Sequence, residues 1–205
     1  MTLLTKTEQD KVAAAISAVE RETDAELVTV LARQADNYAY IPLVWAGIAA
    51  LLVPGLVNYV TDWFGVYTLL LVQWSTFLVL GALFRIPSIN TRLIPRQVRY
   101  WRASNLARRH FLEQNLHHTR GSTGVLIFVS EAERYVEILV DQGVSSKVDN
   151  RVWEGIVQRF TQQVRQGQTC QGFLDCIEAC GEHLKAQIPA THERNELPNH
   201  LVVLA

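Results

Sequence analysis

The sequence predicts an α/β fold in which a central β-sheet is flanked by helices and interrupted by a two-helix transmembrane hairpin. Apolar runs with strand character alternate with segments of helical periodicity, which is typical of a sheet covered by helices. The 44 residues 41–84 contain one charged residue, Asp62, although the 205-residue chain is 49% hydrophobic and carries a formal charge of only −1. This near-zero charge argues against a nucleic-acid-binding protein.

Two uncharged runs, residues 41–60 and 63–84, predict the hairpin. At ~1.5 Å rise per residue, each run is long enough to cross about 30 Å of hydrocarbon. The polar pair Thr61-Asp62 between them predicts a tight turn. Pro54-Gly55 is expected to kink or interrupt the first helix, which leaves open a re-entrant hairpin that never crosses the bilayer. A buried helical hairpin in a soluble fold is the third alternative.

The segment after the hairpin is rich in arginine and lacks acidic residues up to Leu112. Its arginines are Arg85, Arg92, Arg96, Arg99, Arg102, Arg108 and Arg109. The positive-inside rule places this segment in the cytoplasm, and two spans return the N-terminus to the same side. We therefore expect a two-span protein of the cell (inner) membrane with both termini and the soluble domain cytoplasmic. The arginines either only fix this topology or also bind anionic lipid headgroups.

Strands and helices are expected on both sides of the hairpin. Thr5 to Glu8 reads as a capping box that opens a helix ending near Thr23, and residues 26–32 form a buried strand. A helix from Arg96 to about Leu116 has Val98, Trp101, Leu112 and Leu116 among its apolar positions. Strands 125–130 and 135–140 pair as a hairpin, because their link is too short for a helical crossover. Helices from Asp149 to Gly167 and from Thr169 to Gln187 follow, and residues 201–204 could dock on the sheet.

Neither flank alone has enough strands and helices to fold, so we expect one domain that the hairpin splits. Residues 1–36 form its N-terminal part, with one helix and one strand. Residues 37–85 form the transmembrane hairpin, residues 86–190 the C-terminal part of the domain, and residues 191–205 a tail.

The chain resembles the TPM domain family in two stretches, Asp24-Ala25-Glu26-Leu27-Val28-Thr29-Val30 and residues 123–144. The resemblance covers roughly residues 5–33 and 97–188. It implies an α/β sandwich, here a membrane-anchored member with the hairpin inserted in the domain. The family includes a thylakoid-lumen acid phosphatase, photosystem-repair factors and an accessory subunit of a neurotransmitter receptor. Its shared theme is assistance to membrane complexes, and some members bind divalent cations through acidic loop residues.

Asp141 and Asp149 are the candidate ligands for such a cation, for example Ca²⁺. Asp141 follows a strand and Asp149 lies eight residues on, so the two carboxylates could converge at one end of a loop. The alternative is structural, because Asp141 could start a turn and Asp149 could cap a helix. Only Asp141 and Gly143 fit the family pattern here, and Lys147 adds a positive charge where a cation site would need carboxylates.

Two further clusters have structural alternatives. Cys176, Cys180 and His183 share one helix face at i, i+4 and i+7, a spacing that suits zinc, but no fourth ligand is evident and Cys180 fits a buried stripe. Arg120 and the turn 121–124 could hold a phosphate, but this turn lacks a P-loop Lys-Ser/Thr and reads equally as a solvated loop.

The sequence contains no nucleophile elbow, dinucleotide fingerprint, metalloprotease helix or kinase motif set, so no catalytic residue is assigned. We expect a membrane-anchored interaction module that assists assembly, repair or regulation of a membrane protein complex. Its partners would be an unidentified membrane protein and the lipid bilayer, and no nucleic acid. The alternatives are a weak divalent-cation-dependent phosphatase that uses Asp141, and an anionic-lipid-binding protein that uses Arg92, Arg96, Arg99 and Arg102.

Overall fold

The computed structural model describes residues 4–38, 40–61, 65–84, 86, 94–191 and 201–204. It divides the chain into two compact units. We call the unit made of Met1–Ala35 and Tyr100–Ala205 the sheet domain, and the unit Asp36–Arg99 the hairpin unit. The sheet domain is therefore built from two stretches of chain that lie on either side of the hairpin unit in the sequence.

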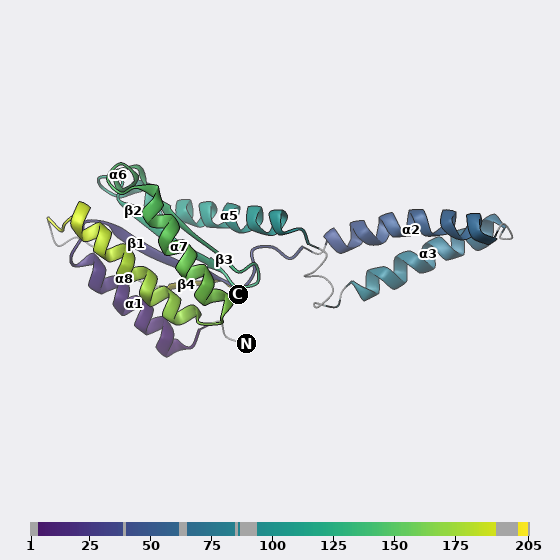
Figure 1. The fold of residues 1–205 in the computed structure, drawn as a ribbon, viewed down its shortest axis with the longest axis horizontal. Coiled ribbons are helices and arrows are strands. Elements are labelled where there is room, and N and C mark those ends of the chain that lie inside the picture. The colour runs from purple at the N-terminus through teal and green to yellow at the C-terminus, as the bar shows by residue number, and fades with distance from the viewer. Residues whose placement is uncertain are drawn as a thin grey trace. The chain divides into compact units, whose positions relative to one another are not determined.

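A four-stranded mixed sheet in the order β3-β2-β1-β4 forms the centre of the sheet domain (Figure 1). Its strands are β1 (Glu26–Ala32), β2 (Gly124–Ser130), β3 (Tyr135–Val140) and β4 (Leu201–Leu204). β1 pairs in parallel with both β2 and β4, and β2 pairs antiparallel with β3. The predicted hairpin of β2 and β3 is confirmed. The closing run 201–204 does dock on the sheet, as the edge strand beside β1.

Three helices cover one face of this sheet: α1 (Lys6–Glu20), α7 (Asn150–Arg165) and α8 (Thr169–Gln187). Helical periodicity explains their packing, because Trp153, Ile156, Phe160 and Val164 fall on one side of α7 and are all buried. The rings of Phe160 and Phe173 of α8 pack edge to face, with 5.0 Å between their centres. Apolar side chains of β1 and β2 complete this core, and the predicted helix Thr169–Gln187 has the same bounds in the structure.

A single helix, α5 (Arg96–Glu113), packs on the opposite face of the sheet. It does so through Ala103 and Ala107, both fully buried, because small side chains let a helix backbone approach a sheet closely. Of the apolar positions noted in the sequence, Trp101 and Leu112 are 59% and 57% exposed, so they do not provide the contact with the sheet. The helix also ends earlier than expected. Asn115 adopts a left-handed φ of 56°, and buried Leu116 opens the 3₁₀ helix η1 (Leu116–His118).

The hairpin unit consists of α2 (Tyr40–Thr61) and α3 (Val66–Leu83), which lie side by side (Figure 1). α2 continues through Pro54, so the proline does not interrupt the helix. Of the predicted turn, Thr61 is the last residue of α2 and Asp62 lies outside the described residues. Beside the helices, Tyr38, Ile41 and Ile94 form a small buried cluster, so the two ends of the inserted segment meet within this unit.

Candidate functional site

Asp141 and Asp149, the predicted cation ligands, both cap helices. Asp141 precedes the short helix α6 (Gln142–Ser145), and its Oδ1 accepts a hydrogen bond of 2.7 Å from the backbone N–H of Gln142. Asp149 precedes α7, and its Oδ1 accepts one of 2.8 Å from the N–H of Arg151. The Asp141 Oδ2 atom is buried and makes no hydrogen bond within the described part of the chain. Each carboxylate therefore has a structural role, and the cation site stays a prediction.

No group of three or more His, Cys, Asp or Glu side chains that could hold a metal ion occurs among the described residues. Cys176 and Cys180 are buried in the core at 2% and 0% exposure, whereas His183 lies on the exposed side of α8. The hydrogen bond with Cys180, together with burial, raises the pKa of the Cys176 thiol well above its ordinary value. The spacing of Cys176 and Cys180 is therefore explained by their place in a buried apolar stripe of α8.

The loop after β3 requires a residue without a side chain at Gly143. Its backbone N–H donates to the Ser122 carbonyl at 2.9 Å, and an added Cβ would lie 2.0 Å from the carbonyl oxygen of Gly121. The loop is thus packed directly on the turn that was the candidate phosphate loop. That turn is closed on itself, because the Ser122 N–H donates to the Thr119 carbonyl.

Five of the seven arginines noted after the hairpin lie among the described residues: Arg96, Arg99, Arg102, Arg108 and Arg109. Arg85 and Arg92 lie outside the described residues. Arg109 pairs with Glu113 one turn along α5, with 2.6 Å between Nε and Oε1, and the Arg102 guanidinium stacks 5.0 Å from the centre of the Trp101 ring. Some of this positive charge is therefore engaged within α5, and the roles in topology and lipid binding stay predictions.

A half-buried carboxyl group, Glu137, lies between β3 and α5. Burial raises its pKa, and the Ser104 hydroxyl donates to its Oε1 at 3.2 Å. Burial and the neighbouring Glu137 raise the pKa of Tyr135 to about 12. The ring of Tyr135 packs against the ring of Tyr100 of α5, with 5.2 Å between the ring centres. These groups form a polar contact that holds α5 on the sheet.

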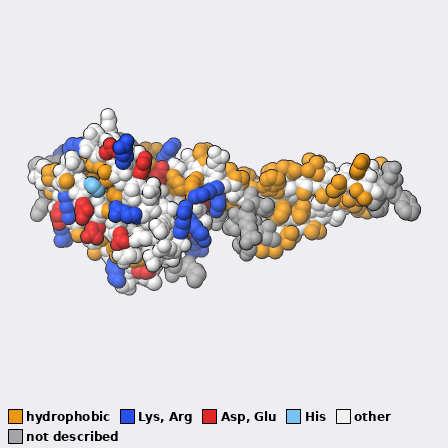
Figure 2. All heavy atoms as spheres, in the orientation of Figure 1, with side chains coloured by type: hydrophobic (Ala, Val, Ile, Leu, Met, Phe, Trp, Pro, Cys, Tyr) orange, Lys and Arg blue, Asp and Glu red, His pale blue; other side chains and the backbone are white. Residues whose placement is uncertain are grey.

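The largest hollow among those described is a cleft of about 1050 Å³ in the sheet domain. It lies where the chain leaves the carboxyl ends of β1 and β2 and where α8 begins, the edge at which open α/β sheets commonly bind ligands. Its charged lining comes from Glu8, Lys11, Arg33, Glu131, Arg134 and Arg165. On the face drawn in Figure 2, basic side chains gather on the sheet domain near β4.

Comparison with known proteins finds a family match for the segment of the chain that includes the Asp141 loop. Residues 95–183 match the family model of the TPM domain. The chain contains a TPM domain. The NMR structure of BA42 protein from the psychrophilic bacterium Bizionia argentinensis is similar in fold, with a TM-score of 0.61 and 19% identity over 98% of this chain and 94% of that one. No curated protein matches the chain.

The TPM match begins at Pro95, after the hairpin, yet the fold extends beyond it. β1 precedes the hairpin and pairs with β2 over seven residues, from Glu26 beside Gly124 to Ala32 beside Ser130. α1 packs into the same core as α7 and α8. The two apolar helices are therefore inserted into the sequence of a single sheet-centred domain.

Sequence reasoning missed the basic cleft at the edge of the TPM domain. Its charged residues are single positions that lie far apart in the sequence, from Glu8 to Arg165. The available signal was the end of each predicted strand, since Arg33 directly follows β1 and Glu131 directly follows β2. These residues can be placed at the same edge of the sheet only when the two strands are known to be parallel. The sequence did not show this pairing, because the hairpin separates the two strands along the chain.

Proposed function

We propose that this protein is a membrane-anchored interaction module, in which the α2–α3 hairpin spans the cell membrane and anchors a cytoplasmic TPM domain to it. In this role it assists the assembly, repair or regulation of another membrane protein complex. The observation that carries the proposal is the outward-facing apolar surface of the hairpin unit.

The support for anchoring is the exposure of apolar side chains on both helices. The segments Tyr40–Val60 and Val66–Leu83 have mean hydropathies of 2.0 and 1.8. Leu51 and Leu71 are each 71% exposed, and α3 buries none of its residues. Figure 2 draws the hairpin unit covered mainly by hydrophobic side chains. Each large apolar side chain left in water forgoes roughly 1.5–3 kcal/mol, so these helices suit hydrocarbon far better than solvent.

The support for sidedness is the pairing of strands across the insertion. β1 and β2 lie on opposite sides of the hairpin in the sequence but are neighbours in one sheet. Both flanks must therefore be on the same side of the membrane, which requires an even number of crossings. The arginine-rich segment that starts after α3 favours the cytoplasmic side.

The support for partner contact lies in α3. Gln73 is a partly exposed side chain, and it is the one amide in the middle of the mostly apolar helix α3. Within hydrocarbon, a side-chain amide gains stability by hydrogen bonding to a neighbouring helix. A hairpin that carries this partly exposed amide is suited to dock on another membrane protein.

Capture of the tagged full-length protein from its native membrane in mild detergent tests this function. We expect one stoichiometric membrane protein to co-purify, and we expect Gln73→Leu to reduce its recovery several-fold. Ser75→Ala is the matched control, because the Ser75 hydroxyl already donates to the Val72 carbonyl of its own helix at 3.0 Å. The absence of any stoichiometric partner, or equal recovery with all three proteins, would contradict the proposal.

A cation-dependent phosphatase is the second candidate, and one observation favours it. The buried Oδ2 atom of Asp141 makes no hydrogen bond in the described structure, which leaves it available to a cation. Under this candidate, Ca²⁺ raises the melting temperature of the wild type but not of Asp141→Asn, and phosphate-ester hydrolysis is lost in the variant. Under the interaction proposal, neither Ca²⁺ nor the substitution changes any hydrolysis, and the side-chain amide oxygen of the variant still caps α6.

A further inference from the structure

Four basic side chains from separate elements line the cleft at the carboxyl ends of β1 and β2. Lys11 comes from α1, Arg33 from the residue after β1, Arg134 from the turn between β2 and β3, and Arg165 from the last residue of α7. The cleft has two acidic residues, Glu8 and Glu131. Four positive charges less two negative ones leave a net charge of +2 in a cleft of about 1050 Å³.

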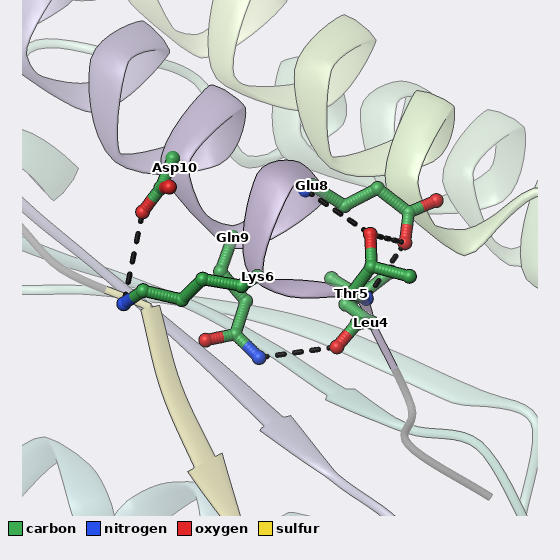
Figure 3. Close-up of polar contacts among 6 residues, drawn as sticks. All are labelled: Leu4, Thr5, Lys6, Glu8, Gln9 and Asp10. Carbon is green, nitrogen blue, oxygen red and sulfur yellow. Dashed lines mark hydrogen bonds and ion pairs between the residues drawn. The ribbon is translucent and has the colours of Figure 1, made fainter.

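Both acidic side chains accept hydrogen bonds from threonines, and Lys11 also attracts Glu8 electrostatically. The Glu8 carboxylate accepts hydrogen bonds from the N–H and hydroxyl of Thr5 at 2.8 and 2.7 Å, in the capping box drawn in Figure 3. Glu131 Oε1 accepts from the Thr169 hydroxyl at 3.0 Å. Arg134 and Arg165 form no ion pair with any described residue. Their guanidinium groups therefore keep their donors for a ligand.

Arg134 occupies a backbone position that ordinarily favours glycine or asparagine. Its φ is 52°, in the left-handed region, and its N–H closes the turn onto the Glu131 carbonyl at 3.0 Å. A residue with a Cβ is disfavoured there relative to glycine. From this turn the Arg134 side chain lines the cleft.

The start of α8 adds backbone donors to the same cleft. Gln168, Thr169 and Cys170 all line it, and Gln168 provides no side-chain cap for this helix of 19 residues. The N–H groups of a first helical turn point out of the N-terminal end of the helix, have no partner within it and carry partial positive charge. They therefore reinforce the field of the four basic side chains.

We propose that this cleft binds a phosphate group, with Arg134 and Arg165 as its principal ligands. Guanidinium groups bind phosphate oxygens bidentately, and a mixed set of side-chain and backbone donors is typical of phosphate sites. The group would belong either to free phosphate or to the headgroup of an anionic phospholipid. The second source is chemically reasonable because Arg33 precedes Tyr40, the first residue of α2, by only seven positions.

Cys170 provides a native reporter for this site. It lines the cleft and is partly exposed, whereas Cys176 and Cys180 are buried. Burial, with a contribution from Glu8, raises the pKa of the Cys170 thiol. A bound phosphate would both shield the thiol and disfavour its thiolate, so it would slow alkylation.

The test measures the rate of Cys170 alkylation by iodoacetamide in the full-length protein, read by mass spectrometry. One arm titrates inorganic phosphate against sodium chloride of equal ionic strength, with the protein in neutral detergent. The other compares bilayer discs containing phosphatidic acid with discs of phosphatidylcholine alone. We expect a saturable slowing of at least fivefold in one or both arms. Slowing in the first identifies free phosphate, and slowing in the second alone identifies the lipid headgroup.

The double variant R134Q/R165Q should lose this protection while keeping the wild-type melting temperature within a few degrees. R151Q is the matched control, since Arg151 is an exposed arginine of α7 that does not line the cleft, and it should behave as the wild type. The proposal is overturned if neither arm slows alkylation. It is equally overturned if R134Q/R165Q is folded and still shows full protection.

Discussion

Individual residues in the TPM domain show how local chemistry sets each position. Gly143 and Asp141 were the two residues of the third-strand loop that fitted the family pattern, and the structure gives each a physical task. Asp141 caps α6, and Gly143 allows two stretches of backbone to touch. The sequence indicated that Asp141 could start a turn. It could not reveal the close approach of Gly143 to Gly121, because that contact joins segments 22 residues apart.

Substituting Gly143 by alanine should destabilise the protein by about 2 kcal/mol or more, because the new Cβ would meet backbone that has no flexible end to move. Gly155→Ala is the control, since nothing lies within 4 Å of its added Cβ in the middle of α7. That change should stabilise by about 0.5–1 kcal/mol through helix propensity. Thermal unfolding in neutral detergent measures both, and equal melting temperatures for the two variants would disprove the packing role of Gly143.

Glu20 should make stability depend on pH. Burial raises its pKa from 4.5 to about 8, with Glu26 adding to the shift, while its Oε1 accepts from the Leu27 N–H at 2.9 Å. The folded state thus holds this proton more tightly than the unfolded state does. Its contribution is fully present below about pH 4.5 and is lost as pH rises through about 8.

Glu20→Gln keeps the acceptor for Leu27 but removes the ionisation. The variant should therefore be more stable than the wild type at pH 8, by about 2 kcal/mol once partial solvent exposure is allowed for, and similar to it at pH 4.5. Melting curves at the two pH values give the comparison. A variant that is equally destabilised at both values would show that Glu20 does not titrate in this way.

At the scale of elements, helices were easier to predict than strand partners. α7 follows from a cap at Asp149 and a repeating apolar stripe, and α8 from its apolar stripe, which are local features. The helical periodicity also predicted α5, but it did not show which residues pack on the sheet, because two alanines rather than the large apolar residues provide that contact. The parallel pairing of β1 with β2 and β4 depends on chain segments separated by up to about 170 residues, and no local pattern encodes it.

Asp149 is the element-scale test, because it was predicted either as a cation ligand or as a cap. Asp149→Ala should lower stability by about 1 kcal/mol through loss of the hydrogen bond to the Arg151 N–H, whereas Asp149→Asn should have little effect. Thermal melts with and without Ca²⁺ measure both changes. A Ca²⁺-dependent stabilisation present in the wild type and abolished by Asp149→Asn would instead favour the cation site.

At the scale of the whole molecule, one feature connects fold and function: a sheet domain whose sequence is interrupted by an apolar hairpin. The sequence predicted the hairpin from composition alone, since 44 residues with one charge have few alternatives. The structure adds that the strands on either side pair with each other, so a hairpin that spans a membrane would have to leave both flanks on the same side of it. The basic cleft arises only at this scale, because it combines single residues from α1, α7 and the ends of two strands.

The central claim is that the hairpin crosses the membrane while the TPM domain stays in the cytoplasm. Gly65, exposed at the start of α3 with nothing within 4 Å, accepts a cysteine without strain. In intact cells, a membrane-impermeant maleimide should label Gly65→Cys at that position, and Cys170 of the same protein only after permeabilisation. Labelling of Cys170 in intact cells, or protection of the cysteine at position 65 until permeabilisation, would contradict this account.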